Sequence, residues 1–189
     1  MTSTDVTVRL ATRADVPGVM ALESRYYVGN LDATEQEDGF ISVLHSADWF
    51  YRAFDTAGLH VAVTDDDAVA GFIAVTPPPP RSDPGLPSIV RAMLDLADTL
   101  DFNGRPIAQQ RFAFRGPVCI DKSARGRGVY SKFNTVTREA YRGRFDCGVL
   151  FVAADNVRSL HTTTTKLEAT SLAVFGVDAR QFHFLAFDF

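Results

Sequence analysis

The sequence predicts an α/β fold, and three observations carry that prediction. A strand-like segment over residues 111–121 is followed by a short turn rich in glycine and arginine and then by a helix from Tyr130. Residues 59–63 and 69–75 read as two strands joined by a polar tip, which is typical of a hairpin. The chain has 189 residues, of which 46% are hydrophobic and 22% charged, so it can bury a substantial core and we expect one domain over residues 1–189.

The first 60 residues supply a strand over residues 6–10 and then a helix. Thr12 and Asp15 are residue types that cap helix N-termini, and Pro17 is acceptable in a first helical turn. The apolar residues farther along are assigned to the core rather than to a ligand site, namely Phe40, Val43, Leu44, Trp49, Phe50 and Phe54.

The last 45 residues predict a strand, a helix and a hairpin. Residues 148–154 form an apolar strand, and Asp155–Ser159 reads as the start of a helix. Residues 172–175 and 181–189 are interpreted as a closing hairpin with its turn over residues 176–180.

A long segment of about residues 77–110 separates two of the expected strands. It opens with Pro77–Pro80, which favours a stiff extended segment. Residues 86–100 then carry apolar side chains at helical spacing, so we expect an inserted helix there. This helix covers core surface or forms a contact in a homodimer, or else it walls a ligand pocket.

The most informative segment is the turn between Asp121 and Tyr130, which contains Arg125, Gly126, Arg127 and Gly128. Glycines let the backbone approach a ligand, and the first N–H groups of a helix have no partners within that helix. The order of strand, basic glycine turn and helix therefore predicts a phosphate site. The turn matches neither the Walker loop nor the dinucleotide fingerprint, whose third glycine is replaced by Ser131. The alternative is a basic turn that merely caps a helix.

Arg125, Gly128 and Tyr130 fit the pattern R-x-x-G-x-[G/A], although Tyr130 departs from the usual small residue at the last position. This pattern and the order of the strands over nearly the whole chain resemble the GNAT superfamily of acyl-CoA N-acyltransferases. The resemblance implies a mixed, mostly antiparallel, twisted sheet with helices on both faces. The segment over residues 77–110 then becomes a helical insertion between the third and fourth strands.

The resemblance also implies a cofactor, acetyl-CoA or another acyl-CoA. The fourth strand would contact the pantetheine and acyl group through its backbone, and the turn would hold the pyrophosphate. Carried over by motif, the cofactor-binding residues are Val118, Cys119, Ile120, Arg125, Gly126, Arg127, Gly128, Val129, Tyr130, Ser131, Asn156 and Ser159.

The implied reaction is transfer of an acetyl group to an amine, for which we expect a small molecule. The acceptor side of the fold would carry Glu23, Tyr26, Tyr27 and Asn30, because acids and aromatic rings attract a cationic amine. The alternative for the acidic stretch that follows is a solvated helix start, with Asp32 or Thr34 as the cap and acids in its first turn.

The expected catalytic acid of the family, a tyrosine in the helix after residue 156, is absent. Its position holds Thr163 or, counted back from Lys166, Thr164. His161 and Tyr130 are the substitute candidates. The threonines at 162–165 can instead hydrogen-bond back to the helix backbone. The missing tyrosine motivates a second hypothesis, an acyl-CoA-binding sensor or regulatory domain without turnover.

Charge, cysteine content and hydropathy limit the classes of partner and location that we expect. A net charge of −4 argues against a general nucleic-acid surface. Cys119 and Cys147 are expected to be free buried thiols, and no metal site is predicted. No apolar run approaches a membrane span and no signal peptide is visible, so we expect a cytoplasmic protein.

Overall fold

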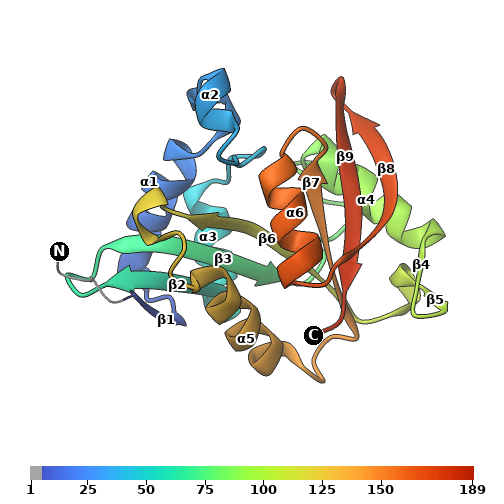
Figure 1. The fold of residues 1–189 in the computed structure, drawn as a ribbon. Helices are drawn as coiled ribbons and strands as arrows, with labels where there is room; N and C mark the ends of the chain where they lie inside the picture. The colour runs from blue at the N-terminus through green and yellow to red at the C-terminus, as the bar shows by residue number, and fades with distance from the viewer. Residues whose placement is uncertain (1–5) are drawn as a thin grey trace. The chain divides into compact units, whose positions relative to one another are not determined.

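The computed structural model describes residues 6–189, which form helices and strands (Figure 1). The helices are α1 (Val16–Arg25), α2 (Ala33–Gln36), α3 (Ala47–Asp55), α4 (Ser88–Thr99), α5 (Val129–Tyr141) and α6 (Val157–Lys166). The strands are β1 (Val6–Leu10), β2 (Leu59–Thr64), β3 (Val69–Thr76), β4 (Asp101–Phe102), β5 (Arg105–Pro106), β6 (Phe112–Ile120), β7 (Cys147–Ala153), β8 (Thr170–Val177) and β9 (Arg180–Phe187). Within residues 6–189, no helix is both long enough and apolar enough to cross a membrane.

Seven strands form one sheet in the order β1-β2-β3-β6-β7-β9-β8, and β4 pairs with β5 separately. The ladders β1–β2, β2–β3, β7–β9 and β8–β9 are antiparallel, whereas β6–β7 is parallel. The sheet is therefore mixed and mostly antiparallel, and the predicted fold class is confirmed.

The chain builds two compact units and passes between them more than once. The first contains the described residues up to Thr76 together with Arg115–Thr137, and the second contains Pro77–Phe114 together with Arg138–Phe189. The parallel ladder of β6 with β7 pairs Phe112–Phe114 with Cys147–Val149 and lies within the second unit. Both β6 and α5 begin in one unit and end in the other.

In the first unit, helices cover both faces of the sheet, because successive side chains of a strand point to opposite faces. One face packs on α1 and α3, and its buried residues include Val19, Leu22, Phe50, Val61, Phe72 and Cys119. The other face packs on α5, and its buried residues include Ala62, Ile73, Val129 and Phe133. The helix expected from Tyr130 is confirmed as α5.

In the second unit, the inserted helix is confirmed as α4. Its buried residues Met93, Leu94 and Ala97 share an apolar cluster with Val149 of β7 and Phe184 of β9. It therefore covers core surface, which was the first of the three interpretations of the insertion. Figure 1 shows α4 and α6 on opposite sides of β7 and β9.

Two details differ from the sequence prediction. Leu44 was assigned to the core but is 47% exposed, because it lies in the loop before α3, whereas Phe50 is fully buried as expected. The closing hairpin has a turn of two residues instead of five. Asp178 and Ala179 both have positive φ, 49° and 63°, which is the backbone that a two-residue hairpin turn requires.

Candidate functional site

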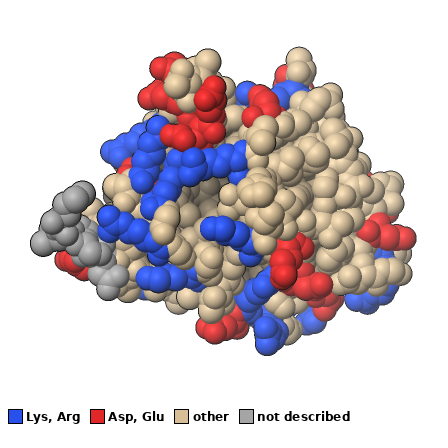
Figure 2. Space-filling view, in the orientation of Figure 1, with Lys and Arg blue, Asp and Glu red and all other residues tan. Residues whose placement is uncertain are grey.

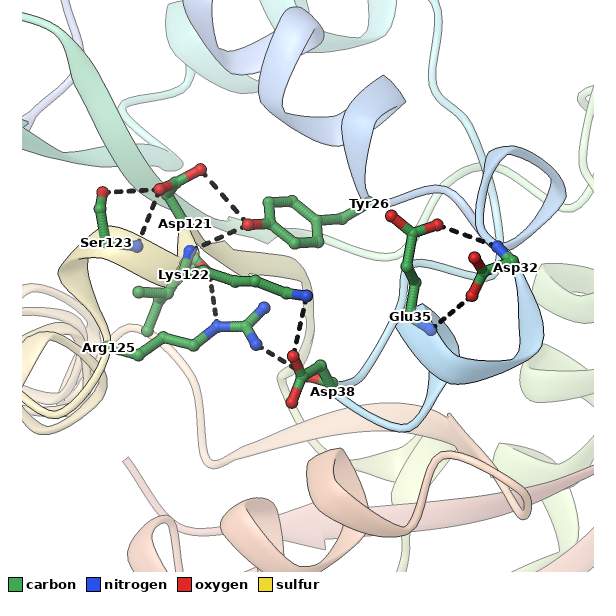
Figure 3. Close-up of polar contacts among 9 residues, drawn as sticks. Tyr26, Asp32, Glu35, Asp38, Asp121, Lys122, Ser123 and Arg125 are labelled. Carbon is green, nitrogen blue, oxygen red and sulfur yellow. Dashed lines mark hydrogen bonds and ion pairs between the residues drawn. The ribbon is translucent and has the colours of Figure 1, made fainter.

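Asp121 holds the start of the loop between β6 and α5 in shape (Figure 3). Its Oδ1 accepts hydrogen bonds from the Ser123 backbone N–H at 2.9 Å and the Ser123 hydroxyl at 2.6 Å, and its Oδ2 accepts one from Arg25 at 2.9 Å. Burial acts to raise the pKa of the Asp121 carboxyl, but the hydrogen bonds from Ser123 and Arg25 outweigh it, so this pKa lies below its ordinary value. The carboxylate is therefore charged at neutral pH.

Gly126 and Gly128 give the rest of the loop its path. Their φ angles are 77° and 75°, a region that costs a residue with a Cβ roughly 1–2 kcal/mol. A Cβ placed on either glycine would meet no atom within 4 Å. The space beside the backbone is open at both positions, so an anion can approach the main chain there.

Arg125 braces this loop against the segment that follows α2. Its Nε donates to the Ile120 carbonyl at 3.0 Å, and its Nη1 donates to the Asp38 carbonyl at 2.9 Å. Its guanidinium lies 5.2 Å from the centre of the Tyr26 ring. These contacts use two N–H groups of a side chain that has five, so an anion could still be bound by the others.

Tyr26 was predicted on the acceptor side, and the structure places it under the loop. The side chain is buried, its hydroxyl accepts from the Lys122 backbone N–H at 2.9 Å, and it donates to Asp121 Oδ2 at 3.3 Å. Burial raises the pKa of this phenol above its ordinary value. The hydroxyl of Tyr26 therefore supports the loop at the point where β6 ends.

Asp32 and Glu35 cap the start of α2, as the alternative interpretation proposed. Asp32 Oδ1 accepts from the Glu35 N–H at 2.8 Å, and Glu35 Oε2 accepts from the Asp32 N–H at 3.0 Å, which is a capping box for α2. Asp38 forms an ion pair of 2.8 Å with Lys122 (Figure 3). Of the other residues predicted to bind the acceptor, Asn30 donates to the Ser24 carbonyl at 2.8 Å, and Tyr27 is half-buried.

The end of β6 alternates between the two faces of the first unit's sheet. Val118 and Ile120 pack with the α5 cluster, whereas Cys119 faces α1 and α3. Burial raises the pKa of the Cys119 thiol to about 12, so this thiol is protonated at neutral pH and unsuited to be a nucleophile. Cys119 and Cys147 are both free and buried, as expected.

Arg115 is a feature that sequence reasoning missed. It is 3% exposed, and its Nη2 donates to Asn134 Oδ1 at 2.7 Å. Its Nη1 donates to the Tyr130 hydroxyl at 3.4 Å, and its guanidinium lies 5.2 Å from the centre of the Tyr130 ring. Tyr130, a catalytic and cofactor-binding candidate, is thus held against a buried cation. The available signal was an arginine in the middle of an apolar strand.

Asn156, Ser159 and His161 lie at the start of α6 in the second unit. Asn156 is buried and accepts a hydrogen bond from the Ser159 N–H at 3.2 Å, so it caps the helix. His161 is exposed, and its carbonyl accepts from the Thr165 hydroxyl at 2.7 Å. Of the two threonines that could stand for the family's tyrosine, Thr163 is buried and Thr164 is exposed. The expectation that these threonines bond back to the helix is confirmed for Thr164 and Thr165, whose hydroxyls donate to the carbonyls of Leu160 and His161.

The side chains of Glu23 and His45 form a pair that the sequence did not predict, although Glu23 alone was a candidate. Glu23 Oε1 lies 2.7 Å from His45 Nδ1, and Glu23 Oε2 accepts from the His45 backbone N–H at 3.0 Å. Their side chains are 2% and 17% exposed. The two residues are 22 positions apart, so no local spacing could have indicated the pair.

Positive charge gathers around the loop. Figure 2 shows lysine and arginine over the part of the chain that carries the loop and α5, with acidic α2 beside them. The basic residues of the loop and its surroundings are Arg25, Lys122, Arg125, Arg127 and Lys132. Since the whole chain has a net charge of −4, this concentration is local and suits a small polyanion.

Comparison with protein-family models and with curated proteins found no match. Solved structures do match over nearly the whole chain. An acetyltransferase of the GNAT family from Streptococcus agalactiae is 14% identical with a TM-score of 0.64, and the match covers 97% of this chain and 95% of that one. The structure of yncA from Salmonella typhimurium with its cofactor acetyl-CoA is 13% identical with a TM-score of 0.61, and 98% and 94% are covered.

The NatC complex bound to Gag peptide and CoA is similar as well. It is 11% identical with a TM-score of 0.64, and the match covers 98% of this chain and 99% of that one. Identities this low show the fold alone. The chain therefore has the fold of the GNAT acyl-CoA N-acyltransferases.

Proposed function

We propose that this protein is an N-acetyltransferase that moves an acetyl group from acetyl-CoA to an amine, with a small molecule as the acceptor. One observation carries the proposal. The loop from β6 to α5 combines two glycines in positive-φ conformations, open space beside them and several cations, on a fold whose solved examples include structures with acetyl-CoA and CoA.

In this proposal, the first unit holds the pyrophosphate of the cofactor. The N–H groups at the start of α5 and the cations Arg125 and Arg127 bind its oxygens, because a helix N-terminus and guanidinium groups both favour anions. The open space at Gly126 and Gly128 fits a phosphate group close to the backbone. The backbone of Val118–Ile120 contacts the pantetheine and acyl group.

When bound, acetyl-CoA supplies an acyl thioester that a neutral amine can attack. The protein orients the two reactants and accepts the proton that the nitrogen loses. His161 and Tyr130 are candidates for protonating the leaving sulfur. His161 is exposed on α6, and the Tyr130 hydroxyl contacts Arg115.

Thermal melting with acetyl-CoA, longer acyl-CoAs, CoA and NAD tests the cofactor. A ligand at 100 times its Kd stabilises the folded state by about 2.7 kcal/mol, which corresponds to a rise in Tm of roughly 5–10 °C. Calorimetry that finds no binding of acetyl-CoA near millimolar concentration contradicts the proposal, and a rise with NAD alone redirects it to a dinucleotide.

Release of CoA in the presence of an amine panel tests turnover and the acceptor class. The panel contains small primary amines and peptides with a free N-terminus, since NatC was solved with a peptide. Faster release with the small amines supports the small-molecule acceptor. Thr163 is buried where a tyrosine was expected, which favours a second candidate function, acyl-CoA sensing without turnover. Binding of acetyl-CoA without release of CoA for any amine supports that sensor.

A further inference from the structure

Glu23 and His45 bring a carboxylate and an imidazole together below the surface of the first unit. Glu23 lies in the last turn of α1, and His45 directly precedes Ser46, the N-cap of α3. The carboxylate is bound twice by one residue, through the His45 backbone N–H at 3.0 Å and through Nδ1 at 2.7 Å. Both the position of His45 and the orientation of its ring are therefore fixed.

The surroundings hold the ring still and limit its contact with water. The His45 ring centre lies 4.0 Å from that of Trp49 and 5.8 Å from that of Phe50. Glu23 as a whole residue is 1% exposed. A buried carboxylate is costly unless it is paired, so Glu23 keeps its partner His45 in place.

The pairing determines which ring nitrogen can do chemistry. A neutral imidazole has one N–H donor and one acceptor nitrogen. Because Nδ1 faces the Glu23 carboxylate, the hydrogen belongs on Nδ1 and the lone pair on Nε2. Within residues 6–189, no hydrogen-bond partner of Nε2 is present, and the side chain remains 17% exposed. Nε2 is therefore an oriented base, and the carboxylate stabilises the imidazolium that forms when it takes a proton.

The pair lies on the side of the sheet that Cys119 of β6 faces. Cys119 belongs to the same buried cluster as Val19, Leu22 and Phe50, which come from α1 and α3. The charged groups that act on the Cys119 thiol are Arg125, Asp121, Glu23 and Arg25, so the Glu23 carboxylate is close to this strand. The first turn of α3, which follows His45 in the sequence, carries one acidic residue, Asp48.

We propose that His45 is the general base that takes the proton from the acceptor amine, and that Glu23 is the positioning residue that orients it. This inference rests on the proposed function, which places the thioester along the backbone of Val118–Ile120. The amine nitrogen forms a bond to the carbonyl carbon while Nε2 accepts one of its protons. The carbon–sulfur bond then breaks, its electron pair leaves with the sulfur of CoA, and the proton passes to that sulfur or to solvent.

His45→Asn is the decisive variant, because its side-chain amide keeps a donor near Nδ1 for Glu23 and removes Nε2. With the most active amine of the panel, we expect kcat to fall about 100-fold, the affinity for acetyl-CoA to stay within twofold, and the acidic limb of the pH profile to disappear. Glu23→Gln should also lower kcat with little change in acetyl-CoA affinity. His183→Asn, the same change on β9, serves as the control and should leave the rate unchanged.

A merely structural pair predicts a different result. Both variants would then lower the Tm while kcat and the pH profile of the remaining folded protein stay as in the parent, and this would overturn the proposal. Nitrogen-15 spectra of the histidine-labelled protein test the pair without any acceptor. The Nδ1–H tautomer of His45 at neutral pH is expected, and the Nε2–H tautomer overturns the role. Absence of acetyl-CoA binding by calorimetry refutes the proposed function itself, whatever the tautomer.

Discussion

β6 leads into α5 and β7 leads into α6, and the two connections treat the start of the helix differently. At α6, the buried side chain of Asn156 accepts a hydrogen bond from the Ser159 N–H, so a protein group satisfies the helix start. At α5, the approach runs through Gly126 and Gly128, which have no side chain and open space beside them. The N–H groups at the start of α6 thus have a partner within the protein, whereas the start of α5 suits a bound anion.

A change at Gly128 should have the largest effect on the difference between the two connections. Replacing Gly128 with Val fills the open space and places a branched residue at a φ of 75°. We expect the affinity for CoA to fall about 100-fold, because the close approach of phosphate to the backbone is lost, and stability to fall by about 1–2 kcal/mol. Calorimetry with CoA and thermal melting measure the two effects.

Gly104→Val is the matched control for this change. Gly104 has a φ of 76° and open space around it, but it lies in the turn between β4 and β5. It should lose similar stability and keep its affinity for CoA. If Gly128→Val binds CoA as tightly as the parent, the loop is not where the pyrophosphate lies.

Asp121 accepts the hydrogen bonds that fix the start of the loop between β6 and α5. Asp121→Asn removes the charge that binds Ser123 and Arg25, so we expect a loss of about 2 kcal/mol at pH 7. Because the pKa of Asp121 is lowered in the folded state, its contribution is present above the ordinary carboxyl pKa and is lost as the pH falls through the folded value. Denaturant unfolding of parent and variant should differ at pH 7 and converge in acid, and a constant difference would contradict this account.

Replacing Arg127 tests the charge of the loop between β6 and α5 and leaves the hydrogen bonds of Arg125 in place. Arg127→Gln should weaken CoA binding about tenfold, in line with the loss of one hydrogen bond to a charged group, and make the affinity less sensitive to salt. Arg144→Gln, an exposed arginine beyond α5 and near Tyr141, is the control. Equal affinities of the two variants across a salt series would remove Arg127 from the proposed site.

Asn156→Ala removes the cap of α6, at the connection from β7, and has the smallest expected effect. Loss of the cap should cost about 1 kcal/mol of stability. CoA affinity should change less than twofold if Asn156 only caps α6. A tenfold loss of affinity would instead support the role that the family resemblance implies, with Asn156 and Ser159 beside the cofactor.

The sequence predicted what is encoded by neighbouring residues. Two apolar runs joined by a polar tip indicated β2 and β3, and helical spacing indicated α4 inside the insertion. The basic glycine turn indicated the loop before α5. These patterns arise within a few residues, so a single sequence displays them.

What the sequence did not predict depends on contacts between distant positions. His45 meets Glu23 across 22 residues, and Arg125 reaches the Asp38 carbonyl across 87. The hydroxyl of Tyr26 also lies under the loop rather than in an open site, since it bonds the N–H of Lys122 96 residues later. No local pattern encodes such pairs, because they form only when the sheet has assembled.

β6 and α5 each belong to both compact units, and this has a consequence for how the chain can be divided. The chain leaves the second unit between Phe114 and Arg115, inside a strand, and re-enters it between Thr137 and Arg138, inside a helix. Interior residues of a helix are held cooperatively, and a cut strand exposes unpaired backbone groups. Neither unit is therefore available as an autonomous fragment, and insertions should be tolerated at hairpin tips such as Asp178–Ala179 rather than at either border.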